Sequence, residues 1–301
     1  MTDRPPLRFG LFIGQAGKSW ARLLDDVLEA EALGYDHAWL VDHLTPTDGP
    51  PERPCGEAWT LLAALAARTS AIELGVLVTN NLFRHPALLA KEAATVDEIS
   101  GGRAILGLGS GWFEPEHRRF GFALPPAGER VARLAEAAIV VRGLLDRERV
   151  TFAGRFYRVE DAFLDPAPVA RPGRPSMPLL IAAHRPRTLA IAARLADIWD
   201  TFPATPGAAT EAVTEDLATQ AARFDELARL AGRDLAAIRR STWTGVHALA
   251  SENRFRRWVD EMTGLGFTDL TTAMPGPGAR DGLRRIASTV IPELRRAPVT
   301  A

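Results

Sequence analysis

The chain has 301 residues, 47% of them hydrophobic and 24% charged, and its 36 basic and 37 acidic residues leave a formal net charge of −1. This near-neutral balance gives no reason to expect nucleic acid or a membrane surface as a partner. The only cysteine, Cys55, excludes an internal disulfide and any zinc site built from cysteines. The longest apolar run, at residues 61–67, is far shorter than a membrane span, and the N-terminus has no apolar signal core. We therefore expect a cytoplasmic protein.

Short runs rich in Val, Ile, Leu, Phe and Trp alternate with longer runs whose apolar residues recur every three or four positions. The first helical run has Ser19 as its expected N-cap and Gly34 as its stop. Strands are expected at residues 7–13, 37–42, 72–79, 103–109, 178–183, 197–202, 239–246 and 268–274. Helices are expected at residues 19–34, 57–70, 86–100, 129–146, 185–196, 210–232, 252–266 and 281–297.

One segment interrupts this alternation. Residues 146–177 contain several prolines and no helical period, which predicts an inserted hairpin and an extended arm. Eight strand and helix pairs without a dividing linker favour one α/β domain over residues 1–301, a closed (β/α)8 TIM barrel rather than a doubly wound open sheet. In such barrels the reacting groups gather at the carboxyl ends of the strands.

The end of the second expected strand carries the best candidate for proton transfer. Asp42 and His43 follow this strand directly, and the pKa of a free imidazole lies close to physiological pH. His43 is therefore the expected general acid or base, with capping of a loop as the alternative role. Six dispersed histidines do not predict a metal site. We expect the cluster from Glu114 to Arg119 to be a solvated loop or short helical turn that packs Phe120 on the barrel.

Three alternating glycines end the fourth expected strand in "AILGLGSGW". Their spacing is not that of a Rossmann turn, and no helix follows directly. Two roles remain open for Gly107, Gly109 and Gly111. Either the missing side chains let a flat ligand approach the main chain, or they relieve crowding in a tapering barrel. Arg84 and His85, which precede a proline at the start of a helix, are expected to be structural.

Several longer motifs resemble a known family. They are "GYDHAWLVDH", "LGVLVTNNLFRHPALLAKEAATVDEISGGRAILGLGSGWFEPEHRRFG", "RFYRVEDAFLDPAPVARPGRPSMPLLIAA" and "RLADIWDTF". Together they make the chain similar to the bacterial luciferase-like flavin and deazaflavin oxidoreductases, and most similar to the actinobacterial branch of probable F420-dependent enzymes. The resemblance implies a luciferase-like TIM barrel and a cofactor bound at its mouth.

Site residues follow from the resemblance position by position. It implies a catalytic role for His43 and a non-prolyl cis peptide between Val76 and Leu77. Ala182 and Ala183 stand where many relatives have a pair of glycines near the cofactor phosphate. The full set of implied cofactor-binding residues is Asp42, Val76, Leu77, Thr79, Asn80, Gly107, Gly109, Ser110, Gly111, Ala182 and Ala183.

Two departures bear on the substrate. Sugar-phosphate dehydrogenases of this superfamily have a tryptophan where this chain has Thr47 and a glutamate where it has Trp112. Glucose 6-phosphate is therefore not the expected substrate. An apolar or aromatic substrate is expected instead, because the mouth carries four aromatic residues: Trp20, Trp112, Phe113 and Phe202.

Three functions remain open. The favoured one is hydride transfer to or from the deazaflavin coenzyme F420. The second is a monooxygenase that uses reduced FMN from a separate reductase, and the third is a flavin-binding barrel without turnover. The resemblance also implies a homodimer.

Overall fold

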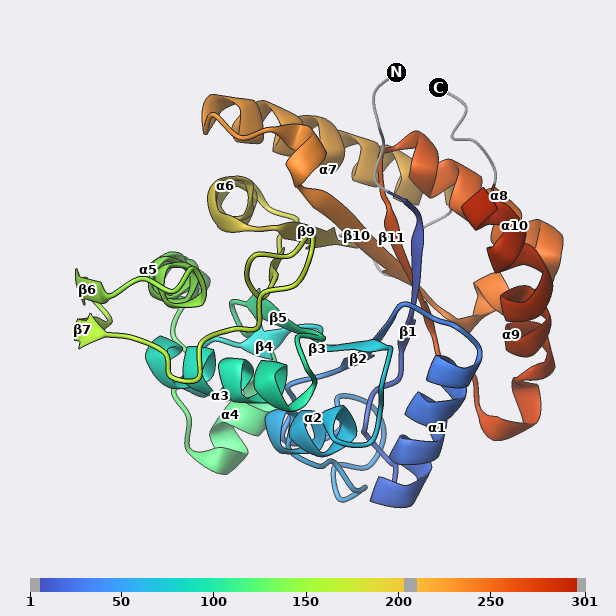
Figure 1. Cartoon of the computed structure of the whole chain (residues 1–301), viewed down its shortest axis with the longest axis horizontal. Helices are drawn as coiled ribbons and strands as arrows, with labels where there is room; N and C mark the ends of the chain where they lie inside the picture. The colour runs from blue at the N-terminus through green and yellow to red at the C-terminus, as the bar shows by residue number, and fades with distance from the viewer. Residues whose placement is uncertain (1–5, 203–209, 297–301) are drawn as a thin grey trace.

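The computed structural model describes residues 6–202 and 210–296 and has a closed barrel of eight parallel strands at its centre (Figure 1). The barrel closes because its first strand in the chain pairs with its last, and its third pairs with its fourth, which is labelled β5. The barrel strands are β1 (Arg8–Phe12), β2 (His37–Leu40), β3 (Glu73–Val76), β5 (Ala104–Gly109), β8 (Leu179–Ala182), β9 (Ile198–Thr201), β10 (Arg239–Thr244) and β11 (Asp269–Ala273). The predicted TIM barrel is confirmed.

Helices surround the barrel, and local signals set their ends. Ser19 accepts a hydrogen bond from the backbone N–H of Arg22, as expected of an N-cap, and Gly34 follows the first helix with φ of 76°. The main helices are α1 (Trp20–Ala32), α2 (Ala58–Ala66), α3 (Pro86–Ile99), α4 (Glu114–Phe120), α5 (Ala127–Leu145), α6 (Pro186–Leu195), α7 (Thr210–Leu230), α8 (Glu252–Gly264), α9 (Asp281–Arg285) and α10 (Ile291–Arg296). Short elements complete the chain: β4 (Thr79–Asn80), η1 (Leu235–Ala237), η2 (Val246–Ala250), η3 (Pro277–Ala279) and the π turn η4 (Ile286–Val290).

The expected insertion is present. Strands β6 (Val150–Ala153) and β7 (Arg158–Ala162) form an antiparallel hairpin that stands away from the barrel in Figure 1. The arm that follows is tied back by Asp97, whose carboxylate accepts hydrogen bonds from the backbone N–H of Val169 at 2.8 Å and from Arg174 at 2.9 Å. This buried carboxylate holds the insertion against α3 without contributing a strand to the barrel.

Two apolar clusters form the core. The larger fills the space between the strands and the outer helices, and the smaller fills the barrel itself with Trp39, Leu77, Ile105, Leu180 and Ile198. A Cβ atom at Gly75 would lie 2.3 Å from the Trp39 ring, so this glycine makes room for the indole inside the barrel. The filled interior leaves the loops at the strand ends as the place for a ligand.

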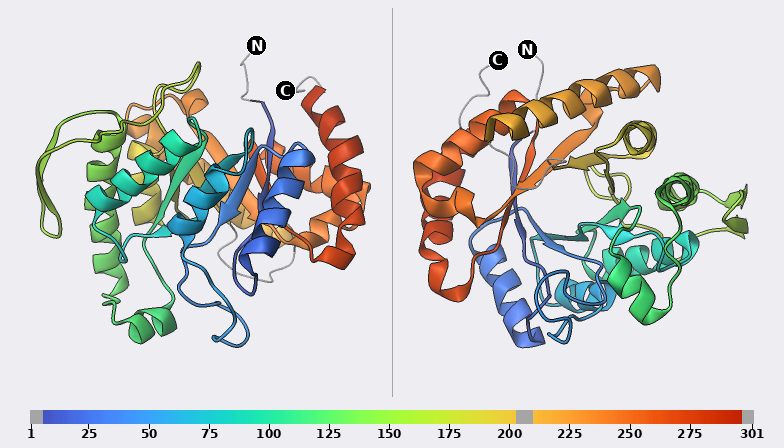
Figure 2. Two further views of the ribbon diagram at one scale, coloured as in Figure 1. Left: turned by 60° about the horizontal axis from the view of Figure 1, so that its bottom comes forward. Right: turned by 180° about the vertical axis from the view of Figure 1, so that it is seen from behind.

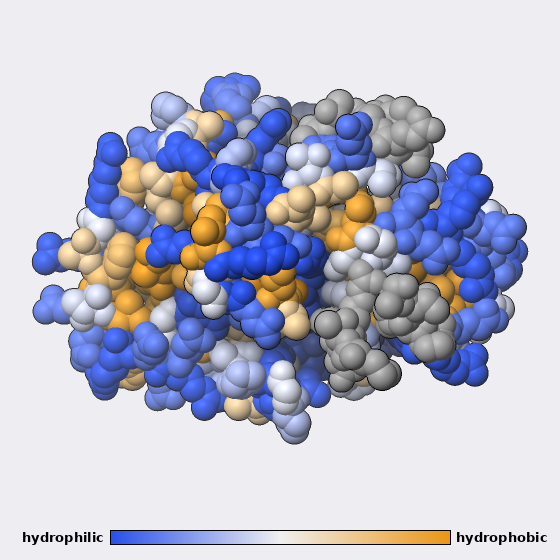
Figure 3. Space-filling view, turned by 90° about the horizontal axis from the view of Figure 1, so that it is seen from above, coloured by the Kyte–Doolittle hydropathy of each residue, from blue (hydrophilic) through white to orange (hydrophobic). Residues whose placement is uncertain are grey.

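The loops of two distant segments meet at one end of the barrel. In the left view of Figure 2, the blue loop after β2 and the green helix α4 both lie at the lower edge of the molecule. The surface in Figure 3 has small apolar areas separated by hydrophilic side chains. Within residues 6–202 and 210–296, no helix is both long and apolar enough to cross a membrane.

Candidate active site

The ring of His43 is held from behind by a buried carboxylate. Its Nδ1 lies 2.9 Å from Oε1 of Glu116, and Oε2 of Glu116 accepts a hydrogen bond of 2.8 Å from the backbone N–H of Leu44. Glu116 is fully buried, whereas His43 remains partly exposed. A carboxylate can only accept hydrogen bonds, so this contact requires a proton on Nδ1, and in the neutral imidazole the lone pair then lies on Nε2.

Two aromatic side chains stand edge-on to the same ring. The ring centroids of Trp112 and Phe113 lie 5.7 and 5.8 Å from that of His43, with interplanar angles of 86° and 85°. Trp112 is 63% exposed, although it is a large apolar side chain. The structure thus brings His43 together with two of the four aromatic residues predicted to line the substrate pocket.

The other two predicted aromatic residues lie elsewhere around the mouth. Trp20 is the first residue of α1 and is 40% exposed. Phe202 follows β9 and contacts the rings of His184 and Trp243, with centroid distances of 5.2 and 5.6 Å. Neither ring contacts Trp112 or Phe113 in the described part of the chain, so their role as pocket residues stays a prediction.

Asp42 joins the ends of two strands. Its carboxylate accepts hydrogen bonds from the backbone N–H of Asn80 at 2.9 Å and from both terminal nitrogens of Arg84 at 2.7 and 3.1 Å. Burial raises the pKa of Asp42, and the Arg84 guanidinium opposes that rise. Arg84 also pairs with Glu57 and Glu92, which confirms its expected structural role. Contact of Asp42 with a cofactor stays a prediction.

The non-prolyl cis peptide lies one residue later in the chain than predicted. The structure has it between Leu77 and Val78, so the prediction of Val76–Leu77 is wrong. The reason is the length of the strand: the N–H of Leu77 still donates to the carbonyl of Leu40 at 2.8 Å, so pairing with β2 extends through Leu77. The chain leaves the ladder only after that residue and then forms β4.

The three glycines at the end of β5 make room for this irregular segment. A Cβ atom would lie 2.1 Å from the Val76 carbonyl oxygen at Gly107, 2.4 Å from a Val78 methyl group at Gly109, and 2.4 Å from Oδ1 of Asn80 at Gly111. The space is therefore taken by the protein, in agreement with the role in relieving crowding. Contact of these glycines and of Ser110 with a cofactor stays a prediction.

Two further predicted residues bond to neighbouring side chains. Thr79 Oγ1 accepts a hydrogen bond of 3.2 Å from the indole of Trp59. The amide nitrogen of Asn80 lies 3.0 Å from Nε2 of His117, whose Nδ1 lies 3.1 Å from the carbonyl oxygen of Ala123. Since the carbonyl must accept, His117 carries its proton on Nδ1 and Nε2 accepts from the Asn80 amide.

The expectation for the segment from Glu114 to Arg119 is right about a short helical turn and wrong about which of its side chains are buried. It forms the helix α4, in which Glu116 and His117 are fully buried while Phe120 is 53% exposed. The helical turn directs Glu116 towards the loop after β2 and His117 towards β4, and it leaves Phe120 outside. Sequence reasoning missed Glu116 because the pairing with His43 joins residues 73 positions apart.

The last strand-end residues are small and tightly held. Ala183 is buried, and its carbonyl oxygen accepts a hydrogen bond of 2.8 Å from the indole of Trp199, while Ala182 ends β8.

Cys55 lies near the site, and its thiol donates to the carbonyl oxygen of His43 at 3.3 Å. Burial raises the pKa of this thiol to about 11, so it is not a reactive thiolate. Residues 6–202 and 210–296 contain no group of side chains suited to a metal ion.

A family model matches nearly the whole chain. The family described as luciferase-like monooxygenase matches residues 6–298. The chain belongs to the bacterial luciferase-like family. The closed parallel barrel agrees with this membership.

Relatives of this luciferase-like chain include F420-dependent enzymes. It is 35% identical over 200 residues to an F420-dependent glucose-6-phosphate dehydrogenase of Kineococcus radiotolerans, a match that covers 65% of the chain and 56% of the relative. The enzyme of the same name from Intrasporangium calvum is 30% identical, with 91% of the chain and 94% of the relative covered. The chain thus spans little more than half of the first relative and nearly all of the second.

A solved structure shows the same luciferase-like barrel. An F420-dependent secondary alcohol dehydrogenase in complex with an F420-acetone adduct superposes with a TM-score of 0.82 at 19% identity, covering 97% of this chain and all of the other. At this identity the likeness establishes the fold alone.

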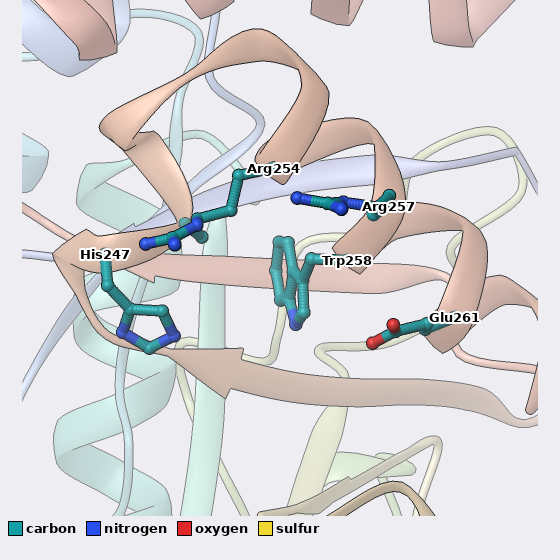
Figure 4. Close-up of a pocket in the computed structure, with 6 residues that line it drawn as sticks. His247, Arg254, Arg257, Trp258 and Glu261 are labelled. Atoms are coloured by element: carbon teal, nitrogen blue, oxygen red, sulfur yellow. The ribbon is translucent and has the colours of Figure 1, made fainter. Parts of the chain in front are cut away.

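The luciferase-like barrel also carries a pocket of about 510 Å³ against α8 and η2. Figure 4 shows the guanidinium groups of Arg254 and Arg257 on one side of the Trp258 indole, with His247 and Glu261 at opposite ends. None of these residues belongs to the predicted site.

Proposed function

We propose that this protein is an oxidoreductase that transfers a hydride between coenzyme F420 and a small apolar or aromatic substrate. The F420-dependent relatives, one of which matches nearly the whole chain, support the choice of cofactor. The observation that carries the proposal is the position of His43, with its Nε2 lone pair free and two aromatic rings edge-on beside it. Such a group exchanges a proton with an oxygen or nitrogen of the substrate.

The residues around the mouth fit a flat ring system. The segment from Leu77 to Asn80 lies close against β5 because the glycines opposite carry no side chains. We propose that this backbone, together with Ala182 and Ala183, holds the ring and its side chain. Bound F420 supplies a carbon that gives or accepts hydride. The protein positions the reactants, and the neighbouring apolar side chains exclude water.

His43 would complete the atom balance of the reaction. When an alcohol is oxidised, its carbon loses a hydride and its oxygen loses a proton, which Nε2 of His43 takes up. In the reverse direction the protonated ring returns that proton to the oxygen of the carbonyl. Asp42 does not take part in this transfer, because its oxygens already bond to Arg84 and to the backbone of Asn80.

Trp112 and Phe113 would select the substrate. Their rings form an apolar wall beside His43, and Trp112 is open to solvent before a substrate covers it. Apolar contact of this kind favours aliphatic or aromatic alcohols and carbonyls over sugar phosphates, which need cationic or polar partners. The glucose-6-phosphate dehydrogenases among the relatives would therefore share the cofactor with this chain but not the substrate.

Fluorescence titration tests the cofactor assignment. The protein is titrated with F420 and with FMN, each in its oxidised and reduced form, and quenching is followed. We expect saturable binding of F420 that is tighter than that of FMN. His43→Ala should bind F420 with little change and lose turnover roughly 10²-fold or more, whereas the exposed His247→Ala should keep both. Tight FMN binding without an F420 response would overturn the assignment.

A reduced-FMN monooxygenase is the second candidate, favoured by the description of the matching family. That reaction needs a partner reductase and consumes O₂, so oxygen uptake with reduced FMN distinguishes it from hydride transfer. A flavin-binding barrel without turnover would show binding alone. We also propose a cytoplasmic homodimer, which light scattering on the purified chain and fractionation of the source cells would test.

A further inference from the structure

We propose that Glu116 is a positioning residue that selects the reactive tautomer of His43. The inference rests on the proposed function, because it concerns the histidine assigned there to proton transfer. Glu116 comes from α4, His43 from the loop after β2, and their atoms approach to 2.9 Å. The proposed effect is that Nδ1 always carries a proton, so that Nε2 always faces the substrate as the exchanging atom.

Burial makes this contact specific. Glu116 is fully buried, and within residues 6–202 and 210–296 its only ion-pair partner is His43. Asp42, by contrast, directly precedes His43 in the sequence, but both of its carboxylate oxygens are engaged by Arg84. A buried carboxylate without a guanidinium partner depends on the imidazole N–H and the backbone N–H for its hydrogen bonds.

The second oxygen of Glu116 holds the orientation. Oε2 accepts a hydrogen bond from the N–H of Leu44, the residue directly after His43. One carboxylate therefore contacts both the ring of His43 and the backbone next to it. The carboxylate plane therefore cannot rotate without breaking one of the two bonds. Trp112 and Phe113 directly precede α4, the helix that carries Glu116. The same short stretch of chain therefore supplies both the carboxylate that orients the His43 ring and the two aromatic rings beside it.

Replacement by glutamine separates positioning from a purely structural role. In Glu116→Gln the amide oxygen can still accept from Leu44, but the amide nitrogen then faces Nδ1 of His43 as a donor. The ring must accept there, and its proton moves to Nε2. A ring with Nε2–H cannot take a proton from an alcohol, so kcat falls while substrate contacts, and with them KM, change little.

Glu114→Gln is the matched control. Glu114 lies two residues earlier in the same helix, and its exposed carboxylate pairs with the exposed Arg118 at 3.3 Å. The same chemical change at Glu114 removes a surface ion pair of small value and leaves His43 untouched.

The closing experiment combines ¹⁵N NMR of the histidine rings with steady-state kinetics. In the wild type without cofactor we expect the His43 spectrum of an Nδ1–H ring, and in Glu116→Gln that of an Nε2–H ring. We also expect kcat to fall roughly 10²-fold in Glu116→Gln and to stay within twofold in Glu114→Gln. A double variant with His43→Ala should lose no more than His43→Ala alone.

Two outcomes would overturn the inference. One is a wild-type spectrum with the proton on Nε2, which can be read even if the glutamine variant does not fold. The other is a Glu116→Gln variant that keeps its kcat. Failure of the proposed function would look different, because the wild type would show no F420 turnover while its NMR spectrum still reported the Nδ1–H ring.

Discussion

The carboxyl group of Asp200 provides a quantitative test of the electrostatics inside the barrel. Among the described residues, four other buried aspartates each pair with an arginine: Asp26 with Arg280, Asp42 with Arg84, Asp97 with Arg174 and Asp269 with Arg239. Asp200 has no such pair in that part of the chain and accepts a hydrogen bond of 2.7 Å from the hydroxyl of Ser241. Burial raises the pKa of Asp200 to about 7, with the Ser241 bond opposing the rise and the Asp269 charge adding to it.

Asp200→Asn removes this titration and keeps an oxygen that accepts from Ser241. In the unfolded chain the carboxyl ionises near its ordinary pKa of 3.8. Between about pH 4 and pH 7 the folded protein therefore holds a proton that the unfolded chain has lost, and this contribution to the free energy of unfolding falls as the pH rises. A difference of about three pH units corresponds to roughly 4 kcal/mol.

Urea unfolding at pH values from 5 to 9 measures the effect. Relative to the wild type, Asp200→Asn should gain stability as the pH rises and reach a plateau above about pH 8. Asp269→Asn is a comparison with a paired aspartate: it leaves the partly buried Arg239 without its carboxylate and should destabilise the protein by roughly 3–5 kcal/mol, and it also removes the charge that adds to the rise of the Asp200 pKa. Curves for Asp200→Asn and the wild type that run parallel across this range would refute an elevated Asp200 pKa.

Two further predictions concern the mouth. Gly109→Ala places a Cβ atom 2.4 Å from the Val78 side chain, so we expect a loss of roughly 1–3 kcal/mol in thermal or urea unfolding and weaker F420 binding in the fluorescence titration. Unchanged F420 affinity would mean that the Leu77–Asn80 segment does not shape the cofactor site. Trp112→Ala removes part of the apolar wall and should raise KM for an aromatic alcohol roughly tenfold with a smaller change in kcat, and an unaltered KM would exclude Trp112 from the pocket.

Much of the fold could be predicted from the sequence. Apolar periodicity located the eight strands, and strand polarity then placed Asp42 and His43 at the mouth, because residues that directly follow a parallel strand lie at its carboxyl end. The prolines of residues 146–177 likewise predicted the hairpin of β6 and β7. These features depend on local pattern, which the sequence carries directly.

The wrong predictions concern positions whose local structure depends on contacts between residues far apart in the sequence. The burial of Glu116 depends on a loop 72 residues earlier, and a seven-residue helix such as α4 has too few turns to show an apolar period. The cis peptide was predicted one residue too early because pairing of Leu77 with β2 extends the strand by one residue. For Gly109, no pattern could distinguish space occupied by a ligand from space occupied by Val78.

Anaerobic single-turnover mixing is the most direct test of hydride transfer to F420. The protein is mixed with oxidised F420 and a series of aliphatic and aromatic secondary alcohols in the absence of O₂, and reduction of the cofactor is followed by absorbance. We predict reduction by the wild type with at least one of these alcohols and roughly 10²-fold slower reduction by His43→Ala. No reduction by any alcohol, together with O₂ uptake in the presence of reduced FMN, would contradict the assignment.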